Sequence, residues 1–161
     1  MAPRDLNEEL VTLLPRLRRF ARALARNPDD ADDLLQLAIE RALTRAEQLR
    51  ADAPLANWMF GIVRHAWIDE LRARARGARV FVPESAGHQV ADAAQSVDAE
   101  LLSVQDAMAR LPEEQRAAVA LVLIEGLSYK EAAHVMEVPI GTLTSRLARG
   151  REALQTTLGE G

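Results

Sequence analysis

The chain of 161 residues contains no cysteine, which excludes disulfide bonds, thiolate zinc sites, iron–sulfur clusters and cysteine nucleophiles. It has no apolar run near the ~20 residues that cross a membrane, and its first residues lack the apolar region of a signal peptide. We therefore expect a soluble, cytoplasmic protein. It also lacks surplus positive charge, because 20 Lys and Arg face 24 Asp and Glu. Phosphate neutralisation supplies most non-specific DNA affinity, so any DNA binding by the chain alone is expected to be weak.

Apolar residues recur at helical spacing along almost the whole chain, which predicts an all-α fold. Pro15 interrupts the first segment, so we expect a kink there or a helix that restarts. A second helix is expected to start after Asn27 and continue to Leu49. The remaining helices are predicted over about 55–76 and 101–111, from Pro112, from Ser128 to about Met136, and from Pro139 to about Leu158. Trp58 and Trp67 lie on apolar stripes and are expected to pack in the core.

The chain is predicted to form two small helical domains joined by a flexible linker. Residues 77–109 carry one basic and five acidic side chains, are rich in Gly, Ser and Gln, and have little apolar periodicity. We therefore divide the chain into a domain at 5–79, an acidic linker at 80–103 and a domain at 104–159. The only strand-like run, Val80-Phe81-Val82, is too short to make a sheet.

The C-terminal domain has the pattern of a helix-turn-helix. Gly126 suits a left-handed helix cap, and Ser128 with Glu131 forms a capping box at the next helix. A tight turn at Glu137-Val138 leads to a longer helix, which can enter the major groove of DNA. The alternative is an ordinary amphipathic helix pair within an α-helical bundle.

Three motifs, in order, resemble sigma factors of bacterial RNA polymerase, most closely the extracytoplasmic-function (ECF) subgroup. Residues 29–36 (DDADDLLQ) are similar to the acidic segment that this family has before a Leu-x-Gln. Residues 58–72 (WMFGIVRHAWIDELR) resemble its promoter-melting helix, and residues 126–147 resemble its C-terminal DNA-binding region. The resemblance implies a non-catalytic subunit that directs core RNA polymerase to chosen promoters.

By this resemblance, the second helix docks on the polymerase. The implied contact residues are Asp33, Leu34, Gln36 and Arg41. Alternatively, the acidic residues form a solvated first helical turn. Leu37 stands where the family usually has an acidic residue, which predicts an altered docking surface or an extra buried contact.

The resemblance also implies that the third helix opens and reads the −10 promoter element. The corresponding positions are Arg64, His65, Asp69 and Arg72. The family often has Asn at the position of His65, so the −10 sequence that is read is expected to differ. Arg72, Arg74, Arg76 and Arg79 either follow DNA phosphates or form an ordinary basic helix end.

The last helix is implied to read the −35 element. Base-facing positions are Thr144, Ser145, Ala148 and Arg149, and phosphate contacts fall on Tyr129, Lys130, Gly141, Thr142, Arg146 and Arg151. The family commonly has Arg or Lys where Thr144 stands, and Thr cannot make the bidentate guanine contact that Arg makes. Weaker or altered reading of the −35 element is therefore expected, with Arg149 as the remaining guanine-contacting candidate.

Partners implied by the resemblance are core RNA polymerase, promoter DNA and an anti-sigma factor, with no membrane insertion. One alternative is a sigma-like mimic that only sequesters an anti-sigma factor, but such a mimic is expected to lose basic DNA-facing residues that this chain keeps. Another is a simple helix-turn-helix repressor, which leaves the melting-helix motif unexplained.

No phosphate loop or Ser-His-Asp arrangement is evident, and His65, His88 and His134 are not in metal spacing. We therefore predict no enzymatic activity, catalytic residue, metal or cofactor.

Overall fold

The computed structural model describes residues 5–77 and 99–159, and all regular elements in these ranges are helices. The strand-like run at 80–82 and Arg79 lie outside the described residues, as does the predicted linker up to residue 98. The last five positions of that linker belong to a helix that begins at Ala99, five residues before the predicted domain boundary.

The N-terminal domain is a bundle of three helices. It contains α1 (Leu6–Ala25), α2 (Pro28–Thr44), the short 3-10 helix η1 (Ala46–Gln48) and α3 (Leu55–Ala75). The Asp5 side chain accepts a hydrogen bond from the Glu8 amide at the start of α1. The Asn27 side chain accepts from the amide of Asp29 at 2.8 Å and from the amide of Asp30 at 3.2 Å, and Pro28 fits the first turn of α2. These caps satisfy amides that have no partner within the helix.

Large apolar side chains from all three helices fill the core of this domain. Phe20 of α1 meets Phe60 of α3 edge-on, with ring centroids 5.1 Å apart. Leu34 of α2 is fully buried, and Trp67 is 3% exposed. Trp58 is only half-buried and packs against the edge of the core.

The C-terminal domain contains four α-helices and one π-helical turn. They are α4 (Ala99–Arg110), α5 (Glu113–Val119), the π-helical turn η3 (Ala120–Ile124), α6 (Tyr129–Met136) and α7 (Ile140–Gly159). Gly126 has φ +79, the left-handed conformation expected of its cap position. The Ser128 hydroxyl accepts from the Glu131 amide at 3.0 Å, while the Glu131 carboxylate accepts from the Ser128 amide at 2.9 Å. The predicted capping box is thus confirmed.

Several helix ends differ from the expectation. Of the two expectations at Pro15, the restart is wrong, because α1 includes this residue; α2 ends at Thr44, so Leu49 lies beyond η1. Pro112 caps α5 from outside, and α7 begins one residue after Pro139. The one-residue differences at Pro112 and Pro139 lie within the usual variation of helix ends.

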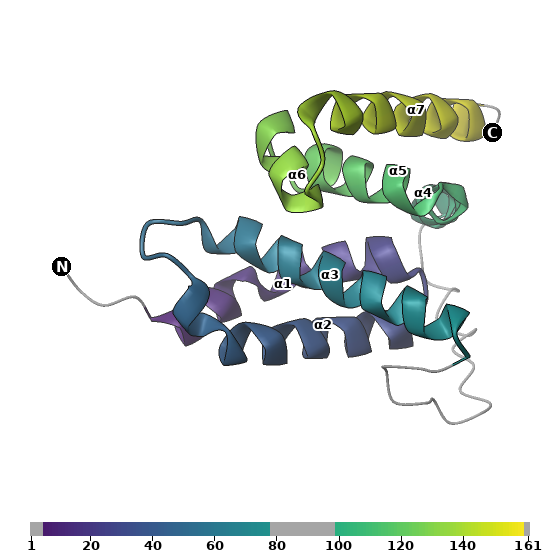
Figure 1. The fold of residues 1–161 in the computed structure, drawn as a ribbon. Coiled ribbons are helices and arrows are strands. Elements are labelled where there is room, and N and C mark those ends of the chain that lie inside the picture. The colour runs from purple at the N-terminus through teal and green to yellow at the C-terminus, as the bar shows by residue number, and fades with distance from the viewer. Residues whose placement is uncertain (1–4, 78–98, 160–161) are drawn as a thin grey trace.

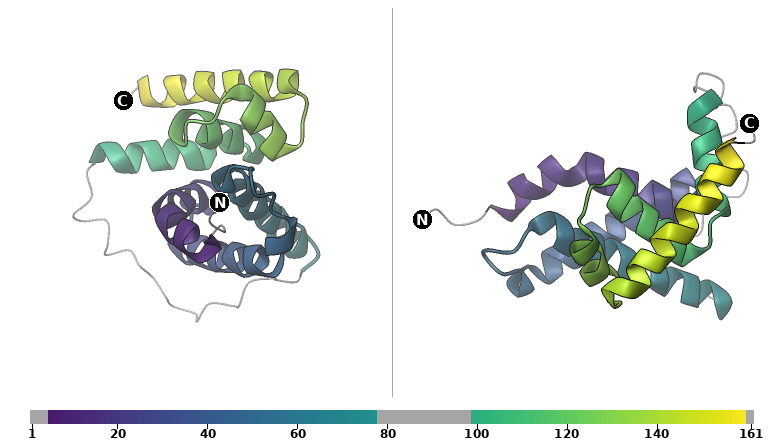
Figure 2. Two further views of the ribbon diagram at one scale, coloured as in Figure 1. Left: turned by 90° about the vertical axis from the view of Figure 1, so that its left-hand side faces the viewer. Right: turned by 90° about the horizontal axis from the view of Figure 1, so that it is seen from above.

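The two domains pack directly against each other. Helices α4 to α7 lie on the side of the N-terminal domain formed by α1 and α3, and α2 lies on the far side (Figure 1). Figure 2 shows the same contact from two further directions. The closed arrangement brings together residues that are more than 70 positions apart in the sequence.

Gly150 marks a close approach of α7 to α5. A Cβ atom at this position would lie 2.7 Å from Cγ2 of Val119. Overpacking of this kind costs about 1–3 kcal/mol, and alanine returns up to about 1 kcal/mol of helix propensity. We therefore expect Gly150→Ala to lower the free energy of unfolding by about 1 kcal/mol in urea denaturation. Gly61→Ala in α3 is the matched control, because nothing lies within 4 Å of its added Cβ. A gain in stability for both variants would contradict the close approach.

Candidate nucleic-acid interface

Helices α6 and α7 form the predicted helix-turn-helix. The turn between them is made by Glu137, which caps α6 with φ +58, and by Val138 and Pro139. Leu143 and Leu147 face inward and are at most 1% exposed, so they fix which side of α7 faces outward. The exposed predicted DNA-contacting residues are Tyr129, Lys130, Gly141, Thr144, Ser145, Ala148, Arg149 and Arg151.

The remaining two predicted contacts on α7 are partly buried. Thr142 is half-buried, and Arg146 is held by an ion pair with Glu114 of α5, 3.3 Å from nitrogen to oxygen. The Thr144 hydroxyl donates a hydrogen bond to the Ile140 carbonyl at 2.8 Å. This local bond points the hydroxyl back along its own helix and favours presentation of the Thr144 methyl group outward.

The four predicted −10 residues line one wall of a cleft between the domains. Arg64, His65, Asp69 and Arg72 come from α3, and Glu114, Glu137 and Arg146 come from the C-terminal domain. The cleft has a volume of about 430 Å³. His65 Nε2 lies 2.7 Å from the Glu137 carboxylate, so this candidate base-contacting side chain is engaged by the other domain.

Arg64 is partly buried in this cleft. Loss of water contact lowers the pKa of its guanidinium, the nearby Glu137 carboxylate opposes that shift, and the positive charge of Arg146 adds to it. The two arginines, predicted to contact different promoter elements, therefore repel each other across the cleft.

Asp69 and Arg41 connect two predicted surfaces. The Arg41 guanidinium of α2 donates to the Asp69 carboxylate of α3 at 2.9 Å. A residue assigned to polymerase docking thus orients one assigned to the −10 element.

The docking residues of α2 differ in exposure. Gln36 is exposed, and Asp33 and Leu37 are half-buried. Leu34 is fully buried among core residues, so it supports this surface from inside and cannot form part of it.

Arg74 belongs to a structural ion-pair network. Its guanidinium donates to Asp30 at 2.7 Å and to Glu70, and it lies 5.4 Å from the Trp67 ring centroid. Burial lowers the pKa of Arg74, but the hydrogen bonds to these two carboxylates outweigh it and raise the pKa overall. Arg72 and Arg76 are exposed at the same helix end and remain available for phosphates.

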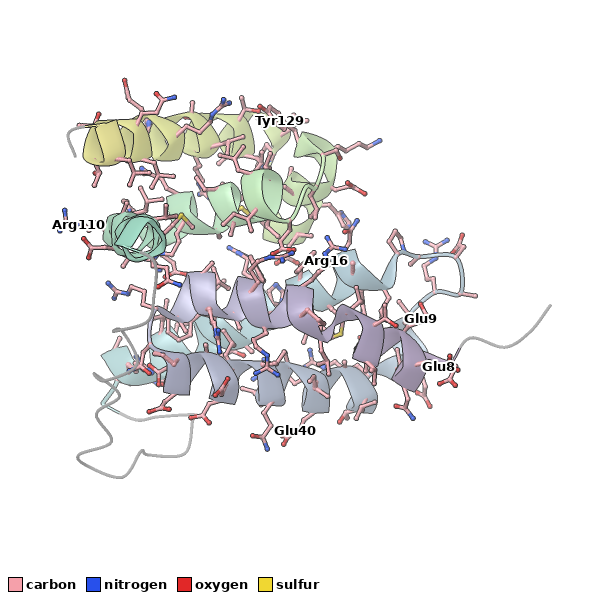
Figure 3. All side chains as sticks on the ribbon, turned by 180° about the vertical axis from the view of Figure 1, so that it is seen from behind. Glu8, Glu9, Arg16, Glu40, Arg110 and Tyr129 are labelled. Carbon is pink, nitrogen blue, oxygen red and sulfur yellow. The ribbon has the colours of Figure 1, made fainter. Side chains whose placement is uncertain are left out.

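Three arginines and one glutamate that sequence reasoning missed join the domains. Glu125, whose side chain is fully buried, accepts from Arg19 at 2.8 and 2.9 Å and from Arg16 at 3.2 Å. Figure 3 shows Arg16 on the face of α1 that points to the C-terminal domain. Arg116 is 4% exposed and donates to the Leu24 carbonyl of α1 at 3.1 Å. The sequence offered one sign of this contact. Arg116 occupies an inward-facing position of α5, where a charged side chain needs a buried partner.

A second cleft of about 510 Å³ lies where the η1–α3 loop faces α6. Asn57 there donates to the Glu131 carboxylate at 3.1 Å. Hydrogen bonds from the Ser128 amide and from Asn57 lower the pKa of Glu131.

Within 5–77 and 99–159, no cluster of three or more metal-ligating side chains occurs, and no helix is long and apolar enough to cross a membrane.

Comparison with known proteins identifies the family. Residues 10–77 match the model of sigma-70 region 2, and residues 101–154 match that of sigma-70 region 4. The chain is 41% identical over 143 residues to the ECF RNA polymerase sigma factor SigM of Mycobacterium tuberculosis, covering 89% of this chain and 71% of that protein. It is 32% identical to the ECF sigma factor EcfG of Rhodopseudomonas palustris, covering 96% and 85%.

A solved relative matches both domains together. The sigma factor RpoE of Bartonella quintana, in complex with the anti-sigma factor NepR, superposes with a TM-score of 0.80 and 33% identity, covering 96% of this chain and 97% of that one. An overlay of this extent includes the placement of one domain on the other as well as the fold of each. On the two matching regions and these relatives, the chain belongs to the ECF subgroup of sigma-70 RNA polymerase sigma factors, which are transcription initiation factors.

Proposed function

We propose that this chain binds core RNA polymerase and directs it to promoters by reading a −10 element with α3 and a −35 element with α7. The observation that carries the proposal is the row of exposed side chains on α7, with Ser145, Ala148 and Arg149 on the side away from Leu143 and Leu147. A helix so oriented presents its first half to base edges in the major groove.

The −10 function rests on α3. Arg64, His65, Asp69 and Arg72 share one face, as a strand-tracking surface requires. Basic and polar groups follow the backbone of an opened strand, and each stacked base contributes about 1–3 kcal/mol. We propose Gln36, Leu37 and Asp33 as the polymerase-contacting surface of α2, with Leu34 beneath it and Arg41 connecting it to Asp69.

Run-off transcription with purified core polymerase on a promoter library tests this function. We expect the chain to select a subset of promoters that share two elements. Release of transcripts from no template, together with tight binding to an anti-sigma factor, would instead support the sigma-like mimic.

Arg149 and Arg151 are expected to have different roles on α7. Both are exposed, and Arg149 lies at the position assigned to base contact. If Arg149 contacts guanine through two hydrogen bonds, Arg149→Ala costs about 1–3 kcal/mol and changes the preferred −35 base. Arg151→Ala is expected to weaken all promoters equally, because a phosphate contact carries no sequence information.

Run-off transcription on promoters that differ at single −35 positions measures both effects. Arg151→Ala serves as the matched control for loss of one exposed positive charge. A uniform loss for Arg149→Ala across all −35 variants would show that its assigned role is wrong.

We further propose that an anti-sigma factor controls this chain. The relative that superposes over both domains was solved in complex with one. An inhibitor helix is expected to compete with core polymerase for the surface around Gln36 and Leu37, as helix-in-groove binding allows. Recovery of a ternary complex of chain, inhibitor and polymerase with unimpaired transcription would contradict this competition.

A further inference from the structure

One buried carboxylate lies at the contact between the domains. The side chain of Glu125 is 0% exposed and lies between Arg16 and Arg19 of α1. Arg19 binds it through two nitrogens, and the Arg16 guanidinium also donates to the Glu125 carbonyl at 3.0 Å. The hydrogen bonds to Glu125 raise the pKa of Arg19. We call Glu125, Arg16 and Arg19 the interdomain clasp.

The π-helical turn η3 places Glu125 for this contact. The Glu125 amide donates to the Ala120 carbonyl at 2.9 Å, five residues back, and the Leu127 amide donates to the Leu121 carbonyl at 2.9 Å. The wider turn changes the direction in which the next residue leaves the helix, and π-helical turns are common at functional positions. Gly126, with φ +79, then ends the segment directly after Glu125.

Arg16 is itself held in place. Its guanidinium carbon lies 5.3 Å from the Phe60 ring centroid, above the core of the N-terminal domain. Arg26 adds a hydrogen bond to the Ala109 carbonyl of α4 at 3.1 Å, and Arg116 one to the Leu24 carbonyl. The clasp therefore lies among further hydrogen bonds between the domains, and its carboxylate is fully buried, unlike an isolated surface ion pair, which would contribute little.

The clasped arrangement conflicts with simultaneous reading of two promoter elements. Glu137, which caps α6 just before α7, lies 2.7 Å from His65 of α3. Promoter elements ~20 base pairs apart are separated by about 68 Å of duplex at ~3.4 Å per pair. The same contact also places Arg64, His65 and Asp69 in a cleft walled by Glu114 and Glu137.

We propose that the Glu125 clasp holds this chain in a closed, promoter-incompetent state, and that its release is a required step in promoter loading. This inference rests on the function proposed above. A binding-competent state that is only fractionally populated lowers the effective affinity by that fraction. Removing the clasp is therefore expected to increase the open fraction and to lower the concentration of chain needed for transcription by about tenfold.

The absence of cysteine allows a direct measurement of the distance between the domains in the full chain. Glu40→Cys on α2 and Thr156→Cys on α7 place spin labels at two exposed positions in different domains. Figure 3 shows Glu40 on the side of the molecule away from the C-terminal domain. Pulsed electron paramagnetic resonance of this labelled chain, without polymerase or DNA, should give one narrow distance population set by the closed arrangement.

Glu125→Gln and Arg19→Gln are expected to broaden this population and shift it to longer distances. Arg18→Gln is the matched control, because Arg18 lies on the same helix but pairs with Asp32 inside the N-terminal domain. Circular dichroism confirms that each variant is folded. A wild-type chain that is already open, or clasp variants with the wild-type distances, would overturn the proposal.

Run-off transcription at limiting core polymerase gives the second readout. The clasp variants should reach half-maximal activity at about one-tenth of the wild-type concentration, and Arg18→Gln should not. Clasp variants that open without this gain would overturn the inhibitory role of the clasp. Absence of transcription from every chain, wild type included, would overturn the proposed function, whereas the distance measurement would still test closure.

Discussion

Replacing Arg116 with Met is expected to destabilise the C-terminal domain strongly. The Arg116 guanidinium is buried and donates to the carbonyl oxygens of Met108 at 3.0 Å, Leu111 at 2.7 Å and Leu24 at 3.1 Å. Burial lowers the pKa of Arg116, and Glu113 opposes that shift at 3.1 Å. Methionine fills a similar volume but removes the Arg116 donor from the Leu111 and Leu24 carbonyls, whereas the Met108 carbonyl keeps the hydrogen bond from the Leu111 amide at 3.1 Å.

A hydrogen bond from a charged group contributes about 1.5–3 kcal/mol, so loss of the Arg116 donors is expected to cost about 3–5 kcal/mol in total. For a chain of this size, that loss lowers Tm by about 10 °C. Arg116→Lys should recover little of it, since an ammonium group cannot reach the several carbonyls that a planar guanidinium does. Urea denaturation and calorimetry measure both effects.

Arg26→Met is the matched control for Arg116→Met. Arg26 is exposed and makes one hydrogen bond to the Ala109 carbonyl, so its replacement should cost less than about 1 kcal/mol. Equal, small losses for the two arginines would show that the carbonyls around Arg116 find other donors.

Shortening the segment between the domains is expected to abolish initiation while both domains remain folded. Residues 78–98 connect the described parts of the chain and span at most roughly 70 Å at ~3.3 Å per residue. That reach just matches ~20 base pairs of duplex, about 68 Å. Deletion of about eight residues leaves a reach of about 43 Å, too short for both elements to be bound at normal spacing.

Run-off transcription on promoters of different spacer length measures the effect. Replacing the same eight residues with a Gly/Ser sequence keeps the reach and is the matched control. The deletion variant should regain activity on promoters with shortened spacers. Full activity of the deletion variant at normal spacing would refute the spanning role.

Helix caps, whose residues lie within one helical turn of one another, were predicted correctly from the sequence. Ser128 and Glu131 form their capping box, Gly126 takes a left-handed cap, and Asn27 caps α2. These features depend on neighbouring residues alone, so residue type and spacing are sufficient. Leu143 and Leu147 face inward at the four-residue spacing of a helix, a feature that likewise depends only on residue type and spacing.

Features that depend on contacts between distant segments were missed. The assignment of Leu34 to docking came from the family resemblance, although its spacing with Ala38 and Ala42, which are also fully buried, already indicates an inward position on α2. The bonds from Arg16 and Arg19 to Glu125 join residues more than 100 positions apart. The π-helical turn was also unexpected, since the apolar run around Leu121 to Ile124 equally suits a regular α-helix.

That turn makes the position of Glu125 sensitive to the length of the chain. A residue in an α-helix is rotated by about 100° from its neighbour, as 3.6 residues per turn require. The wide turn accommodates one residue more than a regular helical turn, so a regular α-helix over the same number of residues would swing the following carboxylate about a quarter-turn away from Arg16 and Arg19. An ECF sigma factor with a regular helix of the same length at this point would therefore be unable to close in this way, even where an acidic residue is still present.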